Sequence, residues 1–534
     1  MKSTSIISMW VLIALMMMGC KPKNDAVQPK DWANTTYLVS SADEQMNETY
    51  YKPYCGFIGD VMPIYDINTQ AFRLFYLQEY RPNPAGTYHP IWGVHYTANG
   101  TYESEGEVIP CGGLKEQDAA IGTGSCIWCK EQNKYYFFYT GNKYFPSADE
   151  NGQAVQYATS TDGKTWSKNT VFVLRGNDYG YSNNDFRDPF VFQDDENLYH
   201  MIVSTTTGKG TLAEFTSTDL QTWTHKGAFM TMMWDRFYEC PDVFKMGDWW
   251  YLIYSEQHRA IRRVQYFKGH TLAELKACTA NDAGKWPDDH EGYLDSRGFY
   301  AGKTASDGQN RYIWGWCPTR KGNDNTATGS DKEEPEWGGA MVMHRIIQHE
   351  DGSLTLGKVP AIDAKYTTVA PVKVMRIQGE ASAAEQYTLT GKSNILFNRL
   401  ERHNHLHMVV KTGTSQDNFG ISLCRGTSMV SDADSSVYYT IVVNAESASE
   451  RKIYFEQRGE KGIGQVGYIE SYAFATPKDN SYTIDLYTDN SVCVMYINDN
   501  VCWTNRIYGI QKNCWSLDCL AGSITVTDVS VTQY

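Results

Sequence analysis

The chain has 534 residues, of which 42% are hydrophobic and 13% aromatic, so it can build large cores and is neither disordered nor fibrous. Its 48 basic and 62 acidic residues give a net charge of −14, and no basic block stands out along the sequence. Because proteins bind nucleic acids and anionic lipid surfaces through such basic patches, we expect neither as a partner. A neutral ligand fits this composition better.

The N-terminal segment predicts an exported protein that is anchored by lipid. Lys2 supplies a positive charge, and residues 6–18 form an apolar run of signal-peptide length, shorter than the ~20 residues of a membrane-spanning helix. Gly19 directly before Cys20 resembles a bacterial lipobox, in which the cysteine is lipidated and becomes the mature N-terminus. An ordinary secretion signal with an incidental Cys20 is the alternative.

This interpretation divides the start of the chain into a signal peptide (1–19) and a tether (20–50). Since no second apolar segment reaches spanning length, the protein would contact the membrane only through the lipid anchor. The expected location is a bacterial membrane, for example the outer membrane on its periplasmic or surface side.

Residues 51–360 have the sequence pattern of a β-propeller. Short aromatic and β-branched runs, such as 135–139 and 249–254, alternate with Gly, Asn and Asp turns. Two segments recur: 160–166 (STDGKTW) returns as 217–223 (STDLQTW), and 186–192 (FRDPFVF) returns as 238–244 (YECPDVF). Strand repeats of ~40–50 residues indicate propeller blades, whose radial arrangement protects the sheet edges. The length of this region predicts about five or six blades.

Residues 365–534 have a different sequence pattern from residues 51–360, and this pattern predicts a β-sandwich. Strand-like runs at 438–443, 482–487 and 492–497 are separated by turns. We expect a supporting or carbohydrate-contacting module, and therefore an all-β protein. The one Cys-x-x-C pair, Cys126 and Cys129, lies in a predicted strand, where positions i and i+3 face opposite sides. Buried small hydrophobes are the expected interpretation, rather than metal ligands.

Asp60, Asp188 and Glu239 stand out among the carboxylates, because each is followed within three residues by proline, which favours the start or edge of a strand. Hydrolysis of a glycosidic bond needs one carboxylic acid to protonate the leaving oxygen and a second carboxylate to attack or to activate water. The inner strands of a propeller converge on its central channel. We therefore predict that these three acids meet around one saccharide; a turn aspartate or a solvated glutamate is the structural alternative for each.

A series of short motifs runs through the predicted propeller in a fixed order. They are 92–95 (WGVH), 122–125 (GTGS), 187–189 (RDP), 239–240 (EC), Asp295 with 299–301 (FYA), and 314–316 (WGW). In this order they resemble the motifs of glycoside hydrolase family 32, the fructan hydrolases and invertases. The resemblance covers about residues 55–534 and implies a five-bladed propeller followed by a C-terminal β-sandwich.

The resemblance also implies roles for single residues. Asp60 would be the nucleophile and Glu239 the general acid/base, while Asp188 would stabilise the transition state with support from Arg187. Ser125, in the second of the quoted motifs (122–125), would bind substrate. The family's retaining mechanism predicts that the carboxyl groups of Asp60 and Glu239 lie roughly 5–5.5 Å apart. No metal or other cofactor is required.

Three other side chains are weaker candidates for substrate contacts. Trp92 and Trp316 are candidates for stacking on sugar faces, with burial in the propeller core as an equal alternative. Asp118 precedes the 122–125 stretch and is a candidate for the lining of the pocket.

The first motif departs from the family pattern, which usually reads Trp-x-Asn-Asp-Pro-Asn-Gly. Gly59 stands in place of the asparagine before Asp60, and Val61 and Met62 replace the proline and asparagine after it. These changes affect the pocket for the terminal sugar. They leave the substrate, and exo or endo action, open.

The leading hypothesis is a retaining β-fructosidase that acts on levan, inulin or smaller fructosides. One alternative is an arabinanase-like propeller hydrolase that inverts configuration, whose carboxyl groups would lie ~6.5–9.5 Å apart. Another is a surface glycan-binding lipoprotein that kept the fold and lost activity. Transfer of fructose to an acceptor hydroxyl also competes with hydrolysis. The sequence predicts no oligomeric state.

Overall fold

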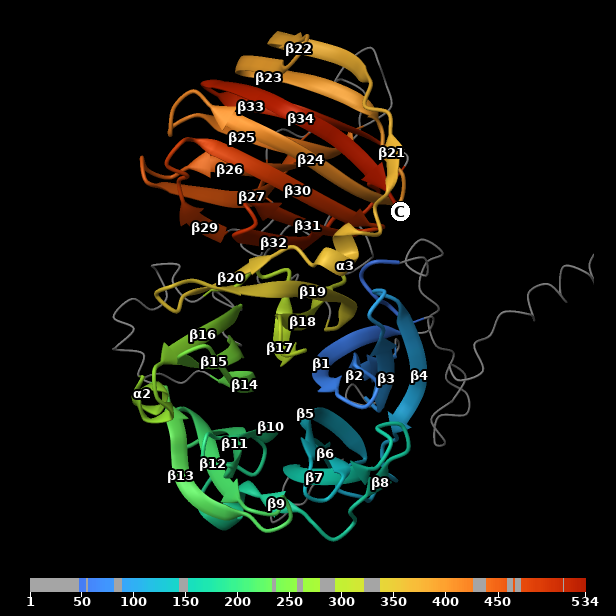
Figure 1. Cartoon of the computed structure of the whole chain (residues 1–534), viewed down its shortest axis with the longest axis vertical. Coiled ribbons are helices and arrows are strands. Elements are labelled where there is room, and N and C mark those ends of the chain that lie inside the picture. The colour runs from blue at the N-terminus through green and yellow to red at the C-terminus, as the bar shows by residue number, and fades with distance from the viewer. Residues whose placement is uncertain are drawn as a thin grey trace, which may run out of the picture.

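Strands are the main secondary structure of the described chain, which is all-β as predicted (Figure 1). The computed structural model describes residues 48–53, 56–80, 89–143, 152–232, 237–256, 263–278, 293–320, 337–425, 438–458, 464–465, 472–511 and 513–534. The predicted signal peptide, Cys20 and most of the predicted tether lie outside these residues. Among the described residues, no helix has the length and apolar character needed to cross a membrane.

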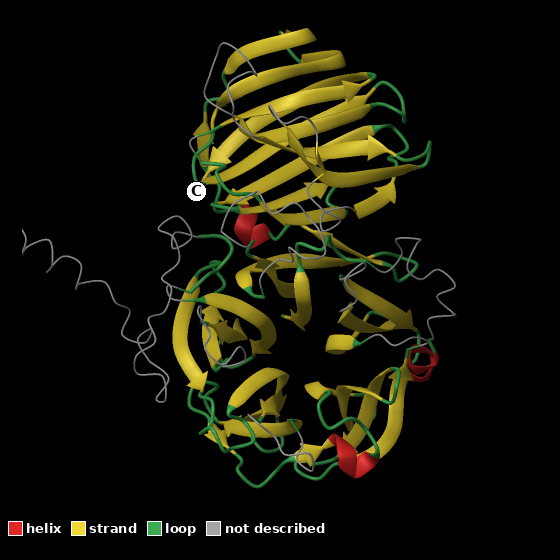
Figure 2. Ribbon diagram, turned by 180° about the vertical axis from the view of Figure 1, so that it is seen from behind, coloured by secondary structure: helices red, strands yellow, loops and turns green. Residues whose placement is uncertain are grey.

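Strands β1 to β20 form a ring around a central axis (Figures 1 and 2). They fall into strand groups that follow one another along the chain, and every pairing within a group is antiparallel. The groups are β1 (Phe57–Asp66), β2 (Ala71–Glu79), β3 (Ile91–Tyr96) and β4 (Tyr102–Ile109); β5 (Ala120–Cys129), β6 (Lys134–Asn142), β7 (Gln153–Ser160), β8 (Ser167–Lys168) and β9 (Leu174–Arg175); β10 (Phe186–Gln193), β11 (Tyr199–Thr206), β12 (Gly210–Ser217) and β13 (Thr224–Thr231); β14 (Tyr238–Met246), β15 (Trp249–Glu256) and β16 (Val264–Gly269); and β17 (Tyr300–Ser306), β18 (Arg311–Pro318), β19 (Gly339–Gln348) and β20 (Leu354–Gly357).

The two ends of the ring are joined by hydrogen bonding between β1 and β19. The register pairs Ile58 with Gly339, so the first and last groups form one 8-stranded sheet, ordered β17-β18-β19-β1-β2-β3-β4 with β20 beside β19. Because an early strand pairs with a late one, the ring is closed by backbone hydrogen bonds as well as by packing. The short helical segments η2 (Gly176–Tyr179), α2 (Leu272–Ala277) and α3 (Pro360–Asp363) lie in connections.

Each innermost strand of the ring carries a β-bulge. The register shifts between Ile58 and Val61 in β1, Gly122 and Gly124 in β5, Arg187 and Phe190 in β10, Glu239 and Asp242 in β14, and Tyr300 and Lys303 in β17. A bulge inserts one extra residue, bends the strand and re-aims a side chain. Since the bulges lie at equivalent places in successive groups, they re-aim side chains at one end of the same axis.

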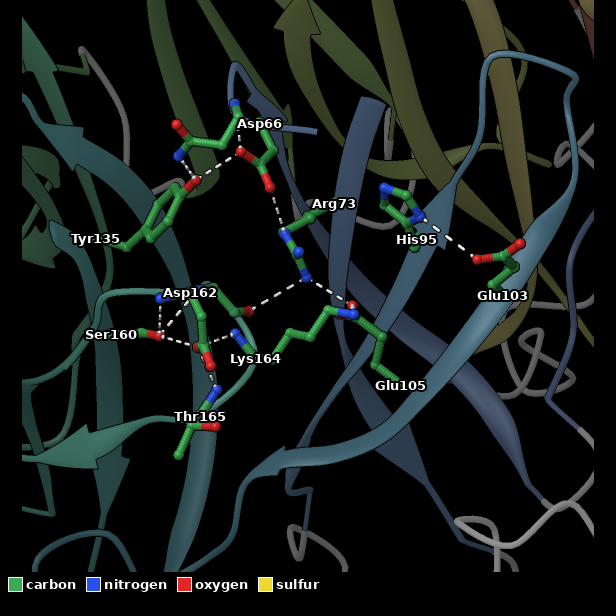
Figure 3. A network of polar contacts seen from close by, with 12 residues as sticks. Asp66, Arg73, His95, Glu103, Glu105, Tyr135, Ser160, Asp162, Lys164 and Thr165 are labelled. Carbon is green, nitrogen blue, oxygen red and sulfur yellow. Dashed lines mark hydrogen bonds and ion pairs between the residues drawn. The ribbon is translucent and has the colours of Figure 1, made fainter. Parts of the chain in front are cut away.

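The repeated STD segments form the same turn in two different groups. Asp162 Oδ1 accepts hydrogen bonds from the backbone N–H groups of Lys164 and Thr165, both at 2.8 Å (Figure 3). Asp219 Oδ1 makes the equivalent contacts at 2.8 and 2.7 Å. These aspartates therefore hold turns, which explains why the sequence repeats there.

The first of these turns also joins two strand groups. The buried Arg73 of β2 forms ion pairs with Asp66 at 2.8 Å and Glu105 at 2.6 Å (Figure 3). Gly163 of the turn has φ +70°, and a Cβ there would lie 2.9 Å from Arg73 Nε. Only glycine fits this place without strain. The Arg73 guanidinium of the first strand group therefore packs directly against the turn of the second group.

The remaining strands form the second part of the molecule (Figure 1). They are β21 (Thr368–Ala370), β22 (Val374–Ala383), β23 (Tyr387–Arg399), β24 (His403–Thr412), β25 (Asn418–Arg425), β26 (Tyr438–Ala445), β27 (Glu450–Arg458), β28 (Gly464–Gln465), β29 (Tyr472–Ala475), β30 (Ser481–Asp489), β31 (Val492–Ile497), β32 (Val501–Arg506), β33 (Cys514–Ala521) and β34 (Ser523–Gln533), connected in one 14-stranded sheet. The ring centroids of Phe419 in β25 and Tyr482 in β30 lie 5.2 Å apart, although these two strands are not hydrogen-bonded neighbours. The sheet therefore folds over a shared apolar core, as a sandwich does.

Buried polar contacts fix this part to the closing strands of the ring. Asp295, just before β17, accepts a hydrogen bond from the backbone N–H of Thr504 at 2.8 Å. The Arg506 guanidinium donates to the carbonyl of Pro318 at 2.7 Å. The second part thus braces β17 to β19 from outside.

Candidate active site

The structure brings Asp60, Asp188 and Glu239 together from three different strands, each within or beside the bulge of its strand. They lie on β1, β10 and β14, which neighbour the central axis in Figure 1. The convergence predicted from the sequence is therefore present in the fold. Its cause is the recurring bulge, which aims a side chain from each strand toward the same end of the axis.

Asp60 is held by two hydrogen-bond donors. The Thr123 hydroxyl of β5 donates to Asp60 Oδ2. The indole N–H of Trp316, on β18, donates to Asp60 Oδ1 at 2.9 Å. Both donors fix the orientation of the carboxylate, while its half-buried position leaves it within reach of a ligand.

Asp188 is the covered member of the three acids, with 4% of its surface exposed. It has a φ of 57°, which aims its side chain away from the regular strand direction, and its Oδ2 accepts the backbone N–H of Cys240 at 2.9 Å. Burial raises the pKa of Asp188 to about 6; the Arg187 charge opposes this shift, and the charges of Glu239 and Asp60 add to it. The carboxyl groups of Glu239 and Asp60 are thus close enough to act on the ionisation of Asp188.

Glu239 is positioned by an arginine and a tyrosine. Arg187 Nη2 donates to Glu239 Oε1 at 3.3 Å, and the Tyr300 hydroxyl donates to Oε2. Arg187 in turn lies over the ring of Phe237, 3.9 Å from its centroid. Although burial alone would lower it, the pKa of Arg187 is raised because Asp188 and Glu239 carry the opposite charge. The Glu239 side chain is 17% exposed, so a ligand can reach it as well.

A buried lysine lies beside these acids on the axis. Lys303 of β17 is 1% exposed, and its Nζ donates to the carbonyls of Gly124 at 2.9 Å and Pro241 at 3.2 Å. Gly124 belongs to the bulge of β5 that carries Thr123, and Pro241 belongs to the bulge of β14 beside Glu239. Burial lowers the pKa of Lys303, whereas Cys240, Asp242, Asp188 and Asp60 oppose that shift. Lys303 also lines a cavity of about 290 Å³ within the ring. It therefore supplies positive charge beneath the acids and holds two bulges together.

Gly59, the departure from the family motif, faces Trp337, which was not among the predicted site residues. A Cβ at Gly59 would lie 2.1 Å from the outer ring of Trp337. That indole stacks on the His89 ring, with centroids 4.4 Å apart. Its centroid lies 6.0 Å from that of Trp316, whose N–H donates to Asp60. The absence of a side chain at Gly59 thus lets Trp337 pack against the backbone next to Asp60. No local signal could have revealed this, because the contact joins the two ends of the ring.

Replacement of Gly59 by asparagine is expected to destabilise the protein by about 1–3 kcal/mol, because the new side chain overlaps the Trp337 ring. Urea unfolding, followed by the change in midpoint, measures this loss. Gly113→Asn is the matched control, since a Cβ there meets only Glu116, at 3.9 Å. Equal stability of the Gly59→Asn variant and the control would contradict the packing account.

The other predicted binding residues have different partners from those expected. Ser125 is buried, where its hydroxyl donates to the carbonyl of Pro189 and accepts from the N–H of Val191, both at 3.0 Å. It therefore ties β5 to β10. The Asp118 carboxylate is 4% exposed and pairs with Lys168 at 2.6 Å. Neither contact involves the three acids.

The two tryptophans proposed for stacking are also buried. Trp92 is 0% exposed within the apolar core of the ring, so the stacking prediction for Trp92 is wrong, because stacking on a sugar needs an open ring face. Trp316 is 1% exposed and acts at the site through its N–H instead. Thr123 and Tyr300, which lie in the quoted motifs but were given no role, contact Asp60 and Glu239 directly.

Comparison with known proteins tests the family. The family model "Glycosyl hydrolases family 32 N-terminal domain" matches residues 51–360, and the model "GH32, BT1760-like, C-terminal domain" matches residues 352–531. The chain belongs to glycoside hydrolase family 32. The resemblance inferred from the motifs is thereby confirmed, and this family 32 protein is a glycoside hydrolase.

Named relatives agree with this assignment. The family 32 chain is 26% identical over 383 residues to a sucrose-6-phosphate hydrolase of Vibrio alginolyticus, covering 69% of this chain and 67% of that protein. Among solved structures, sucrose-6-phosphate hydrolase from Lactobacillus gasseri aligns with a TM-score of 0.67 at 17% identity, covering 93% of this chain and 94% of that one. Exo-inulinase from Aspergillus awamori aligns with a TM-score of 0.65 at 15% identity, covering 93% and 99%. At these identities the two structures support the fold alone.

Proposed function

We propose that this family 32 enzyme cleaves β-fructosidic bonds with retention of configuration. The observation that carries the proposal is the pair of reachable carboxylates, Asp60 and Glu239, beside the covered acid Asp188. A retaining glycosidase needs one carboxylate to attack and one carboxylic acid to protonate the leaving oxygen. Family membership favours this function over the arabinanase-like and non-catalytic alternatives.

In the proposed first step, Asp60 attacks the anomeric carbon of the fructosyl unit while Glu239 protonates the departing oxygen. The bond to the leaving group breaks as the bond to Asp60 forms. In the second step, Glu239 takes a proton from water, the water oxygen attacks the same carbon and Asp60 is released. Thr123 and Trp316 hold Asp60 in place, whereas Arg187 and Tyr300 orient Glu239. The Asp188 carboxylate would stabilise the positive charge that develops on the sugar ring.

The proposed substrates are levan, inulin or smaller fructosides. This rests on the family and on the names of the relatives, which include sucrose-6-phosphate hydrolase and exo-inulinase. Incubation of the purified protein with levan, inulin, sucrose, sucrose 6-phosphate and arabinan, followed by chromatography of the products, tests it. Fructose alone indicates exo action and fructo-oligosaccharides indicate endo action. Arabinose would support the arabinanase-like alternative, and binding without products would support the glycan-binding one.

The stereochemistry is tested separately by adding methanol as an acceptor. A retaining enzyme transfers the fructosyl group to methanol as the β-fructofuranoside, because two displacements restore the starting configuration. The α-anomer as the first product would contradict the mechanism.

The ionisation of Asp188 predicts the acid side of the pH profile. Because its pKa is raised to about 6, Asp188 is protonated below this pH in the folded enzyme and loses its charge-stabilising role there. We therefore expect kcat/KM to rise as the pH increases through about 6. Lys303→Met should shift this limb to higher pH by on the order of one unit, because a positive charge near Asp60 and Asp188 is lost.

Rates measured from pH 4 to 8 decide this prediction. Arg311→Met is the matched control: Arg311 is partly buried and lines the same cavity, but the carboxylate that acts on it is Asp242. If Lys303→Met lowers stability but leaves the acid side of the pH profile unchanged, the role of Lys303 is structural. That outcome would contradict the electrostatic role.

We also propose five blades for the ring, counting the two halves of the 8-stranded sheet separately. The blades would form a domain at 51–360, which precedes a sandwich domain at 365–534.

At the N-terminus we propose a lipid anchor on Cys20 of the exported protein. Cys20→Ser should move the protein from the membrane fraction to the soluble fraction of cells that produce it. Membrane attachment that persists in this variant would contradict the anchor.

A further inference from the structure

Two histidines and an aspartate converge on one face of the second domain. His405 and His407 are alternate residues of β24, so their side chains point to the same side of the strand, and Asp485 of β30 is paired directly with His407. His405 Nε2 lies 2.7 Å and His407 Nδ1 lies 2.8 Å from the same oxygen, Asp485 Oδ1. One ligand atom from each residue lies within 4.8 Å of the other two. The two imidazole nitrogens therefore converge on one carboxylate oxygen.

The rings are oriented by neighbours that leave these atoms in place. Tyr487 stacks on His405 with ring centroids 4.2 Å apart and an interplanar angle of 9°. The Tyr487 hydroxyl donates to Asp363 at 2.6 Å, and the same Asp363 oxygen lies 3.6 Å from His405 Nδ1, the nitrogen turned away from the cluster. A carboxylate behind the outer nitrogen of a histidine is the usual arrangement around a metal-bound imidazole.

Charges of both signs surround the cluster. Lys358 lies 3.0 Å from Asp485 Oδ2, the oxygen that does not face the histidines. Asp485 and Asp528 act on His407 as negative charges, whereas Lys358 opposes them. His407 donates its hydrogen bond to Asp485 Oδ1. The His407 side chain is 33% exposed, whereas Asp485 is 3% exposed. The cluster is therefore open to solvent on one side and anchored on the other.

We propose that His405, His407 and Asp485 bind one divalent late transition metal ion, with Zn²⁺ as the expected ion. Neutral imidazole and carboxylate ligands suit Zn²⁺, Co²⁺, Ni²⁺ and Cu²⁺, whereas Mg²⁺ and Ca²⁺ prefer all-oxygen sites. Three protein ligands leave the fourth tetrahedral position to water on the exposed side. Binding displaces any proton held by the histidines. Because Lys358 and Asp363 border the cluster, the ion would stiffen the connection between the two domains without touching the three acids.

A second group, Asp295, His344 and Cys502, also brings possible ligands together. All of its members are fully enclosed at the domain junction, where the Tyr496 hydroxyl lies 2.7 Å from His344 Nδ1 and the Thr504 N–H donates to Asp295. The ligand atoms of this second group are closed off from solvent, whereas His407 is 33% exposed, so an ion reaches the open cluster more readily. The thiol of Cys502 gives the test a spectroscopic means to tell the two apart.

Calorimetric titration of the chelator-treated full chain, purified without a histidine tag, tests the proposal with Zn²⁺. We expect one equivalent to bind, and His407→Gln to weaken the affinity by about tenfold or more. His403→Gln is the matched control, because His403 lies on the same strand face but pairs with Asp489 at 2.8 Å. Its affinity should equal that of the unaltered protein. Melting curves without metal show whether the variants are folded.

Titration with Co²⁺ then identifies the ligands. Tetrahedral nitrogen and oxygen ligands should give visible d–d bands without a thiolate charge-transfer band, and the bands should disappear in His407→Gln. A thiolate band would place the metal on Cys502 and overturn the proposal. So would the absence of saturable Zn²⁺ binding, or equal affinity in His407→Gln and the unaltered protein.

Discussion

Asp60→Asn is expected to lower kcat on fructosides by on the order of 10⁴-fold, because the amide cannot form the covalent bond to the sugar and the remaining groups cannot replace it. The substitution keeps the size of the side chain, and Thr123 can still donate to the amide oxygen. Folding should therefore survive, which circular dichroism and thermal melting can confirm. Initial rates at saturating substrate measure the effect.

Asp118→Asn is the control for this experiment. Asp118 was also a candidate site residue, but it pairs with Lys168 and accepts from Tyr139 instead of contacting the acids. We expect its kcat to stay within about tenfold of the unaltered enzyme. Similar losses in both variants would contradict the assignment of Asp60 as the attacking group.

Glu239→Gln is expected to lower kcat by about 10²–10⁴-fold on natural fructosides, because the leaving oxygen is no longer protonated. A fructoside with an activated leaving group does not need this proton in the first step. In the second step, azide can replace the water that Glu239 would activate. The variant should therefore recover much of its rate with an activated substrate and azide, and form fructosyl azide.

The same rescue distinguishes the two carboxylates. Asp60→Asn should not recover with an activated leaving group, since it lacks the attacking group of the first step. Rescue of Asp60→Asn combined with no rescue of Glu239→Gln would show that the two roles are exchanged. Failure of both rescues would contradict a covalent mechanism.

The convergence of the three acids could be predicted from the sequence, because the strand repeats and the order of the motifs both indicate how the strands are arranged. Asp60, Asp188 and Glu239 lie at or beside the bulges of three different strand groups, although at different positions within them, so their convergence follows from the ring. The bulges themselves could not be predicted: a shifted register, such as the one beside Asp188 with its φ of 57°, depends on pairing with the next strand.

Contacts between distant segments explain the errors. Trp92 and Trp337 are both aromatic and both follow polar segments, but one lies fully in the core and the other packs on Gly59 beside the site. Exposure of an aromatic ring depends on which strands flank it in the closed ring. Lys303 was likewise missed, because a lysine between Gly302 and Thr304 gives no sign that its amine reaches two bulge carbonyls across the axis.

Mass spectrometry of the trapped intermediate tests the central claim most directly. Glu239→Gln is mixed with an activated fructoside, so that the first step proceeds and the second is slow, and the protein is then denatured and digested. A hexosyl adduct on the carboxylate of Asp60 is the predicted result. An adduct on Asp188 or any other side chain, or turnover without an adduct, would contradict the role given to Asp60.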